Sequence, residues 1–332
     1  MESGETLLEV KNLSVDFRMD RKTVLHAVRN VSFTLKKGET LGLVGESGCG
    51  KSVSCMSILQ LNPPQRTLYP TGEILFEGRD LLKMNAKQLR SVRGREIGVV
   101  FQEPMTAMNP LFTIGDQLME ALRVHDAHLS KAEAYARSLE AVRRVKIPNP
   151  ERILSEYPFA LSGGMRQRAM IAMAMIARPK LLICDEPTTA LDVTIQAQVL
   201  DLMNELKEET GMSILFVTHD LGVISEMADR VLIMYGGRVC EEAEVDELFT
   251  HPRHPYTMGL IDSHPDPDFH GDRLKVIPGS VPTLRDMPAG CPFHNRCAYA
   301  QASCRDEFPA EEIVCEGHQI SCHCWRNTPK GE

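Results

Sequence analysis

The chain has 332 residues, of which 43% are hydrophobic and 25% are charged, and its formal net charge is −8. This length accommodates one large domain and a smaller one, and the composition is ordinary for a soluble globular protein. The acidic balance and the lack of a long Lys/Arg block argue against a protein whose main role is to bind nucleic acid. The N-terminus has no signal-peptide pattern, and the longest apolar run, residues 170–177, is far shorter than the roughly 20 residues of a membrane span. We therefore expect a cytoplasmic chain.

Short apolar runs bounded by turn residues recur along the chain. They are continuous rather than alternating, which is typical of parallel strands that are covered on both faces. We expect such strands over residues 40–44, 97–101, 181–184, 214–217 and 231–234. Helices are expected over 165–178 and 194–210, an exposed antiparallel strand over 72–78, and a mostly helical insertion over 103–160. This order predicts an α/β architecture.

The chain changes character past about residue 245, where prolines become dense and are followed by cysteines. We place a domain boundary there, which predicts a large domain over 1–245 and a small Cys-rich domain over 246–332.

A glycine-rich segment follows the first of these strands and precedes an amphipathic run. It consists of Gly45, Glu46, Ser47, Gly48, Cys49, Gly50, Lys51 and Ser52, and Val53 follows it. Strand, glycine loop and helix in this order predict a loop whose backbone N–H groups cradle the phosphates of ATP. Lys51 reaches the β- and γ-phosphates and the Ser52 hydroxyl ligates Mg²⁺ in such loops. The alternative is a chance match, which the flanking strand and helix argue against.

Two further segments carry residues suited to a phosphate site. Asp185 and Glu186 end a buried strand, where Asp185 can hold Mg²⁺ and Glu186 can polarise the attacking water. Ser162 is a helix N-cap candidate, and Gly163 and Gly164 free backbone N–H groups beside it, which makes an anion site. The alternatives are an acidic pair that caps a strand and an ordinary capped helix.

The cysteines are unevenly distributed, with six of ten in the last 42 residues. Four of them are spaced Cys291-x5-Cys297-x6-Cys304-x17-Cys322, which is not the Cys-x2-Cys pairing of common zinc sites. Four thiolates can bind Zn²⁺ or an iron–sulfur cluster, or they can remain free thiols. Cys315 and Cys324 are nearby spare thiols, and His294, His318 and His323 are possible substitutes in a zinc site.

In its motif order the chain resembles ATP-binding cassette (ABC) ATPases. The order is the phosphate loop, Gln102, the signature Leu161–Gly164, Asp185-Glu186, Ala190-Leu191-Asp192 and Thr218-His219-Asp220. The resemblance implies a P-loop NTPase fold with a mostly parallel core sheet, an antiparallel β subdomain and a helical subdomain at about 103–160.

The same resemblance implies roles for individual residues. Ser162 and Gly164 complete the γ-phosphate site of a second, head-to-tail cassette. Gln102 ligates Mg²⁺, senses the γ-phosphate and signals to a membrane partner, whereas His219 holds the γ-phosphate and the water. Phe17 matches the aromatic residue that stacks on adenine.

Several segments are similar to the oligopeptide/dipeptide (peptide/nickel) importer ATPases and to their D-type subunit. These are residues 101–110, 185–194, 254–257, 277–282 and the cysteine block. The resemblance implies a peripheral protein at the cytoplasmic face of the membrane, two transmembrane permeases, a paralogous ATPase as heterodimer partner, an extracellular substrate-binding protein and no nucleic acid. It also implies a 4Fe–4S cluster on Cys291, Cys297, Cys304 and Cys322. The alternative is an ABC ATPase without a transport role, acting on nucleic acid or in iron–sulfur handling, and the cargo stays open between dipeptides, longer peptides, nickel chelates and opines.

Overall fold

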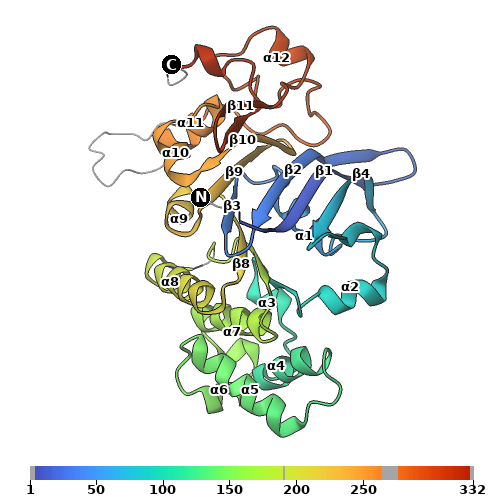
Figure 1. Cartoon of the computed structure of the whole chain (residues 1–332), viewed down its shortest axis with the longest axis vertical. Helices are drawn as coiled ribbons and strands as arrows, with labels where there is room; N and C mark the ends of the chain where they lie inside the picture. The colour runs from blue at the N-terminus through green and yellow to red at the C-terminus, as the bar shows by residue number, and fades with distance from the viewer. Residues whose placement is uncertain (1–3, 190, 264–275, 330–332) are drawn as a thin grey trace. The chain divides into compact units, whose positions relative to one another are not determined.

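The computed structural model describes residues 4–189, 191–263 and 276–329 (Figure 1). Its contacts divide the chain into two compact units. The first unit consists mainly of Lys83–Val217, and the second consists of Glu5–Leu35, Thr40–Leu82 and Thr218–Glu332.

The first unit contains a run of three neighbouring parallel strands. They lie in the order β8 (Ser213–Thr218), β7 (Leu181–Asp185) and β6 (Ile97–Val100). All residues of β7 and β8 are buried, as their continuous apolar runs predict.

The helices of the first unit include those of the predicted insertion, in which α4, α5 and α6 pack on one another, and α4 and α5 also pack on α7, which follows the insertion (Figure 1). Side chains of Thr113, Ser130, Ser162 and Asp192 cap four of the helices by accepting backbone N–H bonds. The helices are α2 (Ala86–Val92), α3 (Pro104–Ala107), α4 (Ile114–Arg123), α5 (Lys131–Arg144), α6 (Pro150–Ser155), α7 (Gly163–Met175) and α8 (Val193–Thr210). The α7 helix starts and ends earlier than the predicted 165–178, because Ser162 caps it and Arg178 has a left-handed φ of 56°.

The second unit contains strands of two sheets. In one, β3 (Thr40–Val44) pairs in parallel with β9 (Arg230–Tyr235), and β10 (Arg238–Glu244), β12 (His318–Ile320) and β11 (Glu312–Cys315) extend it as antiparallel strands. The other has the order β2 (Val24–Lys36), β1 (Thr6–Arg18), β4 (Thr67–Phe76) and β5 (Arg79–Asp80). This unit therefore supplies the expected antiparallel subdomain.

The strand expected over 72–78 differs from the observed β4. It begins at Thr67 and is not simply exposed, because Ile74 and Phe76 alternate toward the core and are fully buried. The helices of this unit are α1 (Lys51–Ile58), α9 (Leu221–Met227), α10 (Val245–Thr250), α11 (Pro255–Asp262) and α12 (Ser303–Asp306). None of the helices in the described part of the chain has the length and hydrophobicity needed to cross a membrane.

Candidate functional site

The phosphate loop runs from the end of β3 to the start of α1. Gly45, Gly48 and Gly50 have φ values of 155°, 80° and 100°, which side-chain-bearing residues rarely adopt. At Gly45 a Cβ atom would lie 2.2 Å from the carbonyl oxygen of Met234, so neighbouring backbone also excludes a side chain there. The loop therefore has the left-handed turns that point successive N–H groups to one side.

Lys51 is 4% exposed and is held by the loop itself. Its Nζ donates to the carbonyl oxygens of Gly45, at 2.6 Å, and Glu46, at 3.1 Å. Its ammonium group thus lies against the loop that it is predicted to complete. The remaining predicted loop residues differ in exposure, since Ser47 and Gly48 are exposed, Ser52 and Val53 are half-buried, and Cys49 and Gly50 are buried. Burial also raises the pKa of the Cys49 thiol.

Glu46 has contacts that the sequence did not predict. Its two carboxylate oxygens accept hydrogen bonds from Arg296, at 2.6 and 3.0 Å, and its backbone N–H donates to the Tyr256 hydroxyl at 2.8 Å. Arg296 lies 250 positions further along the chain, so no local pattern reveals the pair. The sequence shows only that Arg296 directly precedes Cys297, one of the predicted cluster ligands.

In the first unit, the structure brings Gln102 and Glu186 together. The Gln102 side-chain amide donates to Glu186 Oε2 at 3.1 Å, and the hydroxyl of Thr189 donates to the same oxygen at 2.9 Å. Glu186 has a left-handed φ of 46°, and its N–H donates to the Val217 carbonyl at 2.9 Å. Asp185, the last residue of β7, is 7% exposed. A carboxylate oriented by two donors can position a water molecule.

The signature segment opens α7. Ser162 Oγ accepts the N–H of Met165 at 3.4 Å, a long bond, and both Ser162 and Gly163 are exposed. A Cβ atom on Gly163 would meet no atom within 4 Å, whereas one on Gly164 would lie 2.7 Å from Ile195 Cγ2. The start of α7 is therefore open at Gly163. Of the following motif, Ala190 lies outside the described residues, and Asp192 caps α8.

His219 and Phe17 belong to the second unit. His219 is exposed directly after β8, where Asp220 caps α9 by accepting the N–H groups of Gly222 and Val223. Phe17 is half-buried on β1 opposite Thr67 of β4.

Five cysteines of the second unit lie close together: Cys291, Cys297, Cys304, Cys322 and Cys324. We call them the thiol cluster. The sulfurs of Cys304 and Cys324 are 3.5 Å apart, and the Cys291 N–H donates to the Cys304 carbonyl at 2.8 Å. Burial and then the neighbouring thiols raise the pKa of Cys291 to about 11. The structure thus gathers the four predicted ligands together with Cys324.

Cys315 is exposed and lies in a different group. Among the described residues, the three Cys, His, Asp or Glu ligand atoms that lie within 4.8 Å of one another belong to Glu247, Cys315 and His318. No three sulfurs of the thiol cluster are that close. His318 is fully buried between Glu241, at 2.9 Å, and Glu247, at 3.2 Å. Burial alone would lower the pKa of His318, but the two carboxylates outweigh it and raise the pKa.

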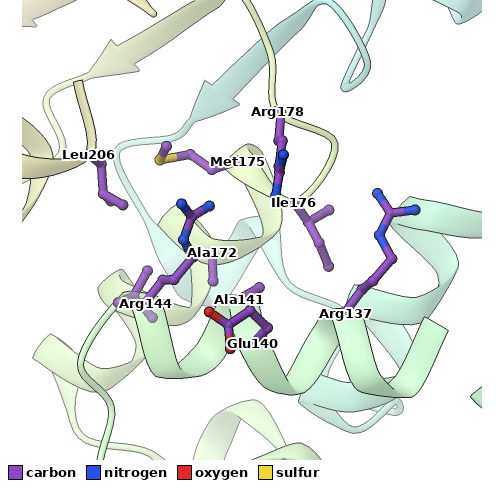
Figure 2. Close-up of a pocket in the computed structure, with 10 residues that line it drawn as sticks. Arg137, Glu140, Ala141, Arg144, Ala172, Met175, Ile176, Arg178 and Leu206 are labelled. Atoms are coloured by element: carbon purple, nitrogen blue, oxygen red, sulfur yellow. The ribbon is translucent and has the colours of Figure 1, made fainter. Parts of the chain in front are cut away.

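Two pockets of the first unit differ in what lines them. One of about 340 Å³ is lined by Gln102, Gly163 and Pro187, among others, and so touches two predicted site residues. Another of about 460 Å³ lies between α5, the end of α7 and α8 (Figure 2). Its lining includes Arg137, Arg144 and Met175 but none of the predicted site residues.

Two family models match the chain. One, described as ABC transporter, matches residues 28–189, and the other, described as oligopeptide/dipeptide transporter, C-terminal region, matches residues 240–304. The first includes the phosphate loop and the strand that ends in Asp185. The second includes α11 and three members of the thiol cluster.

Curated relatives are similar to the chain over nearly its whole length. A probable peptide ABC transporter ATP-binding protein of Sinorhizobium fredii is 48% identical, over 98% of this chain and 96% of the relative. The dipeptide transport ATP-binding protein DppD of Bacillus subtilis is 47% identical, over 99% and 97% of the two chains. Among solved structures, a dimeric ATP-binding cassette in a post-hydrolysis state with ADP and Pi has a TM-score of 0.64 and 28% identity, and covers 72% of this chain and 98% of its own.

Proposed function

Because this chain belongs to the ABC transporter family, among the ATP-binding proteins of peptide transporters, we propose that it is the ATP-hydrolysing subunit of a multisubunit importer of peptides or a related small cargo. The observation that carries the proposal is the phosphate loop, which leads from the buried β3 into the N-terminus of α1 with Lys51 bound to its carbonyls. A loop of this kind binds phosphates through backbone N–H groups and the positive end of the helix dipole. The importer role is favoured over an ABC ATPase without a transport role, because relatives named for peptide transport match this chain over nearly its whole length.

The described residues support a division of labour in ATP hydrolysis. The loop and Lys51 bind the phosphates, and Ser52 and Asp185 supply the hydroxyl and carboxylate oxygens that Mg²⁺ prefers. Magnesium neutralises charge on the phosphates when it is bound. Glu186, held by Gln102 and Thr189, orients and polarises the attacking water.

Other predicted residues complete the nucleotide site. His219 contacts the γ-phosphate and water, Gln102 adds a ligand to Mg²⁺, and Phe17 stacks on adenine. Ser162 and Gly164 serve the nucleotide of a second cassette, for which the exposed start of α7 is suited. The second cassette is a paralogous subunit.

Exposed apolar side chains of the first unit support contact with permeases. Leu111 is 80% exposed, Phe112 51% and Phe159 61%, and the ring of Phe159 stacks on that of Tyr157 with centroids 5.5 Å apart. Exposed apolar clusters of this kind are typical of protein interfaces. We place the subunit at the cytoplasmic face of the membrane, under two permeases that an extracellular binding protein supplies with cargo.

The test compares two substitutions in the purified full chain. Glu186→Gln should abolish ATP turnover, by at least about 100-fold, and retain ATP binding, because it keeps the shape of the side chain but removes the carboxylate. Lys51→Ala should lose binding itself, because the cation that meets the phosphates is gone. Steady-state hydrolysis and equilibrium binding of a fluorescent ATP analogue measure the two effects. Full turnover in Glu186→Gln would refute the role of this carboxylate.

The thiol cluster supports a 4Fe–4S cluster on Cys291, Cys297, Cys304 and Cys322, with Cys324 beside them. A single Zn²⁺ with Zn–S bonds of about 2.3 Å holds its sulfurs about 3.8 Å apart. Among the described residues, no three sulfurs of the thiol cluster lie within 4.8 Å of one another, so they are not arranged around a single zinc ion. A 4Fe–4S cluster would be held by the four thiolates and would crosslink residues 291–322.

Cys297→Ser tests this assignment. In protein purified without oxygen, the wild type should show broad visible absorption and about four irons per chain, and Cys297→Ser should lose most of both. The matched control is Cys315→Ser, because Cys315 is exposed and outside the thiol cluster. Colourless wild-type protein that contains zinc would instead support the zinc alternative.

A further inference from the structure

We propose that Arg296 and Tyr256, two residues of the C-terminal tail (residues 246–332), are positioning residues of the phosphate loop and set its affinity for ATP. They act through Glu46, the second residue of the loop, which both of them contact. The inference rests on the proposed function, since it assumes that the loop binds ATP.

The Arg296–Glu46 pair has the geometry of a strong interaction. The guanidinium donates to Glu46 Oε2 at 2.6 Å and to Oε1 at 3.0 Å, so both carboxylate oxygens are engaged. The side chain of Arg296 is 6% exposed and that of Glu46 is 28% exposed. Bidentate, largely buried pairs of this kind are stronger and better oriented than solvent-exposed ion pairs.

Arg296 is itself rigidly held. Its Nη1 also donates to the Tyr235 hydroxyl at 3.1 Å, and its Nε donates to the carbonyl of Pro278 at 2.8 Å. The guanidinium lies over the rings of Tyr235 and Phe293, 5.7 and 5.8 Å from their centroids. A side chain with this many partners can fix the position of Glu46 rather than follow it.

Tyr256 fixes the backbone of the same residue. It is fully buried, and its hydroxyl accepts the Glu46 N–H at 2.8 Å. That bond orients the peptide group between Gly45 and Glu46, whose carbonyl is one of the two that Lys51 contacts. The ring of Tyr256 packs on Tyr235 at 4.7 Å and on Phe293 at 5.3 Å, which keeps the hydroxyl in place.

The turn that carries Arg296 packs against the backbone beside the loop. A Cβ atom on Gly236, between β9 and β10, would lie 2.6 Å from Pro292 Cβ, so the two turns are in close contact. The neighbouring Gly237 donates its N–H to the carbonyl of Cys49 at 2.9 Å. The tail therefore braces the loop by side-chain bonds at Glu46 and, through this turn, near Cys49. A loop that is already in its binding conformation loses less entropy when ATP binds.

Equilibrium binding of a fluorescent ATP analogue to the purified full chain tests the proposal. Arg296→Ala should weaken binding about tenfold, Arg296→Lys less, and Tyr256→Phe a few-fold, because each removes a different part of the contact with Glu46. Combining Arg296→Ala with Glu46→Gln should add little to either change alone, because both act through the same pair. The turnover rate at saturating ATP should change less than the affinity for ATP. A general loss of structure would instead lower both.

The matched control is Arg326→Ala. Arg326 is also in the tail and also pairs with a glutamate, Glu312 at 2.6 Å, but it is 66% exposed and does not contact the loop. Its replacement should leave ATP affinity unchanged. An equal loss in Arg326→Ala and Arg296→Ala would overturn the proposal, because it would indicate a nonspecific effect of the tail.

Lys51→Ala distinguishes a wrong positioning role of Arg296 and Tyr256 from the lack of an ATP site. If it loses binding while Arg296→Ala, Tyr256→Phe and Glu46→Gln all bind like the wild type, the positioning role is wrong and the ATP site stands. If the wild type binds no better than Lys51→Ala, the proposed function itself fails. Should Arg296→Ala not fold, Tyr256→Phe and Glu46→Gln decide, because each changes few atoms.

Discussion

His254 is a fully buried histidine whose pKa is lowered to about 4, because burial disfavours the charged imidazolium and nearby Glu241 compensates only in part. Its Nδ1 accepts the N–H of Tyr256 at 3.0 Å and so caps α11. Nδ1 must then be unprotonated, and the proton of the neutral ring is on Nε2, which has no hydrogen-bond partner among the residues that the structure describes. The cap at the start of α11 therefore requires a neutral His254 ring. The residue whose N–H it binds, Tyr256, also contacts the phosphate loop.

This pKa predicts an acid-sensitive stability. The folded value of about 4 lies below the unfolded value of about 6.5, so the unfolded chain binds a proton that the folded chain does not. The free energy of unfolding should therefore fall as the pH falls from about 6.5 to about 4, by up to about 3 kcal/mol from this group. Urea unfolding across that range measures it.

His254→Asn keeps a side-chain acceptor at the cap but does not titrate, so its stability should vary less between pH 6.5 and 4. His128→Asn, at an exposed position, is the control and should follow the wild type. A His254→Asn profile parallel to that of the wild type would assign the acid sensitivity to other groups.

At the scale of elements, β6 and α7 approach each other closely at Gly98. A Cβ atom there would lie 2.4 Å from the carbonyl oxygen of Ala174, which is backbone and cannot rotate away. Gly98→Ala should therefore lower the stability of the first unit by about 1–3 kcal/mol, because α7 has to shift from the strand. Chemical denaturation followed by circular dichroism measures this loss.

Gly163→Ala is the control for stability, since a Cβ at that position meets no atom within 4 Å. Equal stability in the two variants would show that α7 shifts without cost.

Elements and site residues were predictable to the extent that their signals are local. The strands around Val44 and Asp185 were predicted because buried parallel strands leave continuous apolar runs, and the phosphate loop because its parts are consecutive. Gln102 was predicted as a site residue only through the resemblance to a family, and its hydrogen bond to Glu186, across 84 positions, was not predicted. Thr189, the second donor to Glu186, was missed because a lone threonine after a strand carries no pattern.

At the scale of the whole molecule, composition and contacts divide the chain differently. Prolines and cysteines mark a change near residue 245, and the boundary placed there stays a prediction. The contacts instead group residues 218–332 with the phosphate loop in one unit. This grouping of the tail with the phosphate loop was not predictable from the sequence. The Arg296–Glu46 contact, for example, joins residues 250 positions apart, and charge pairing leaves no periodic pattern in a sequence.

The pairing of β12 with β10 has a consequence for any shortened form of the protein. Glu241 and Glu242 of β10 lie opposite Ile320 and Gln319. A chain that ended at residue 245 would keep β10 but lose its neighbour, so a row of backbone N–H and C=O groups would face solvent. Such an open edge is a template on which strands of other chains add. The last strands therefore replace the seven-residue edge of β10 by the four-residue edge of β11, which offers other chains less backbone to pair with, whatever the cysteines beside them bind.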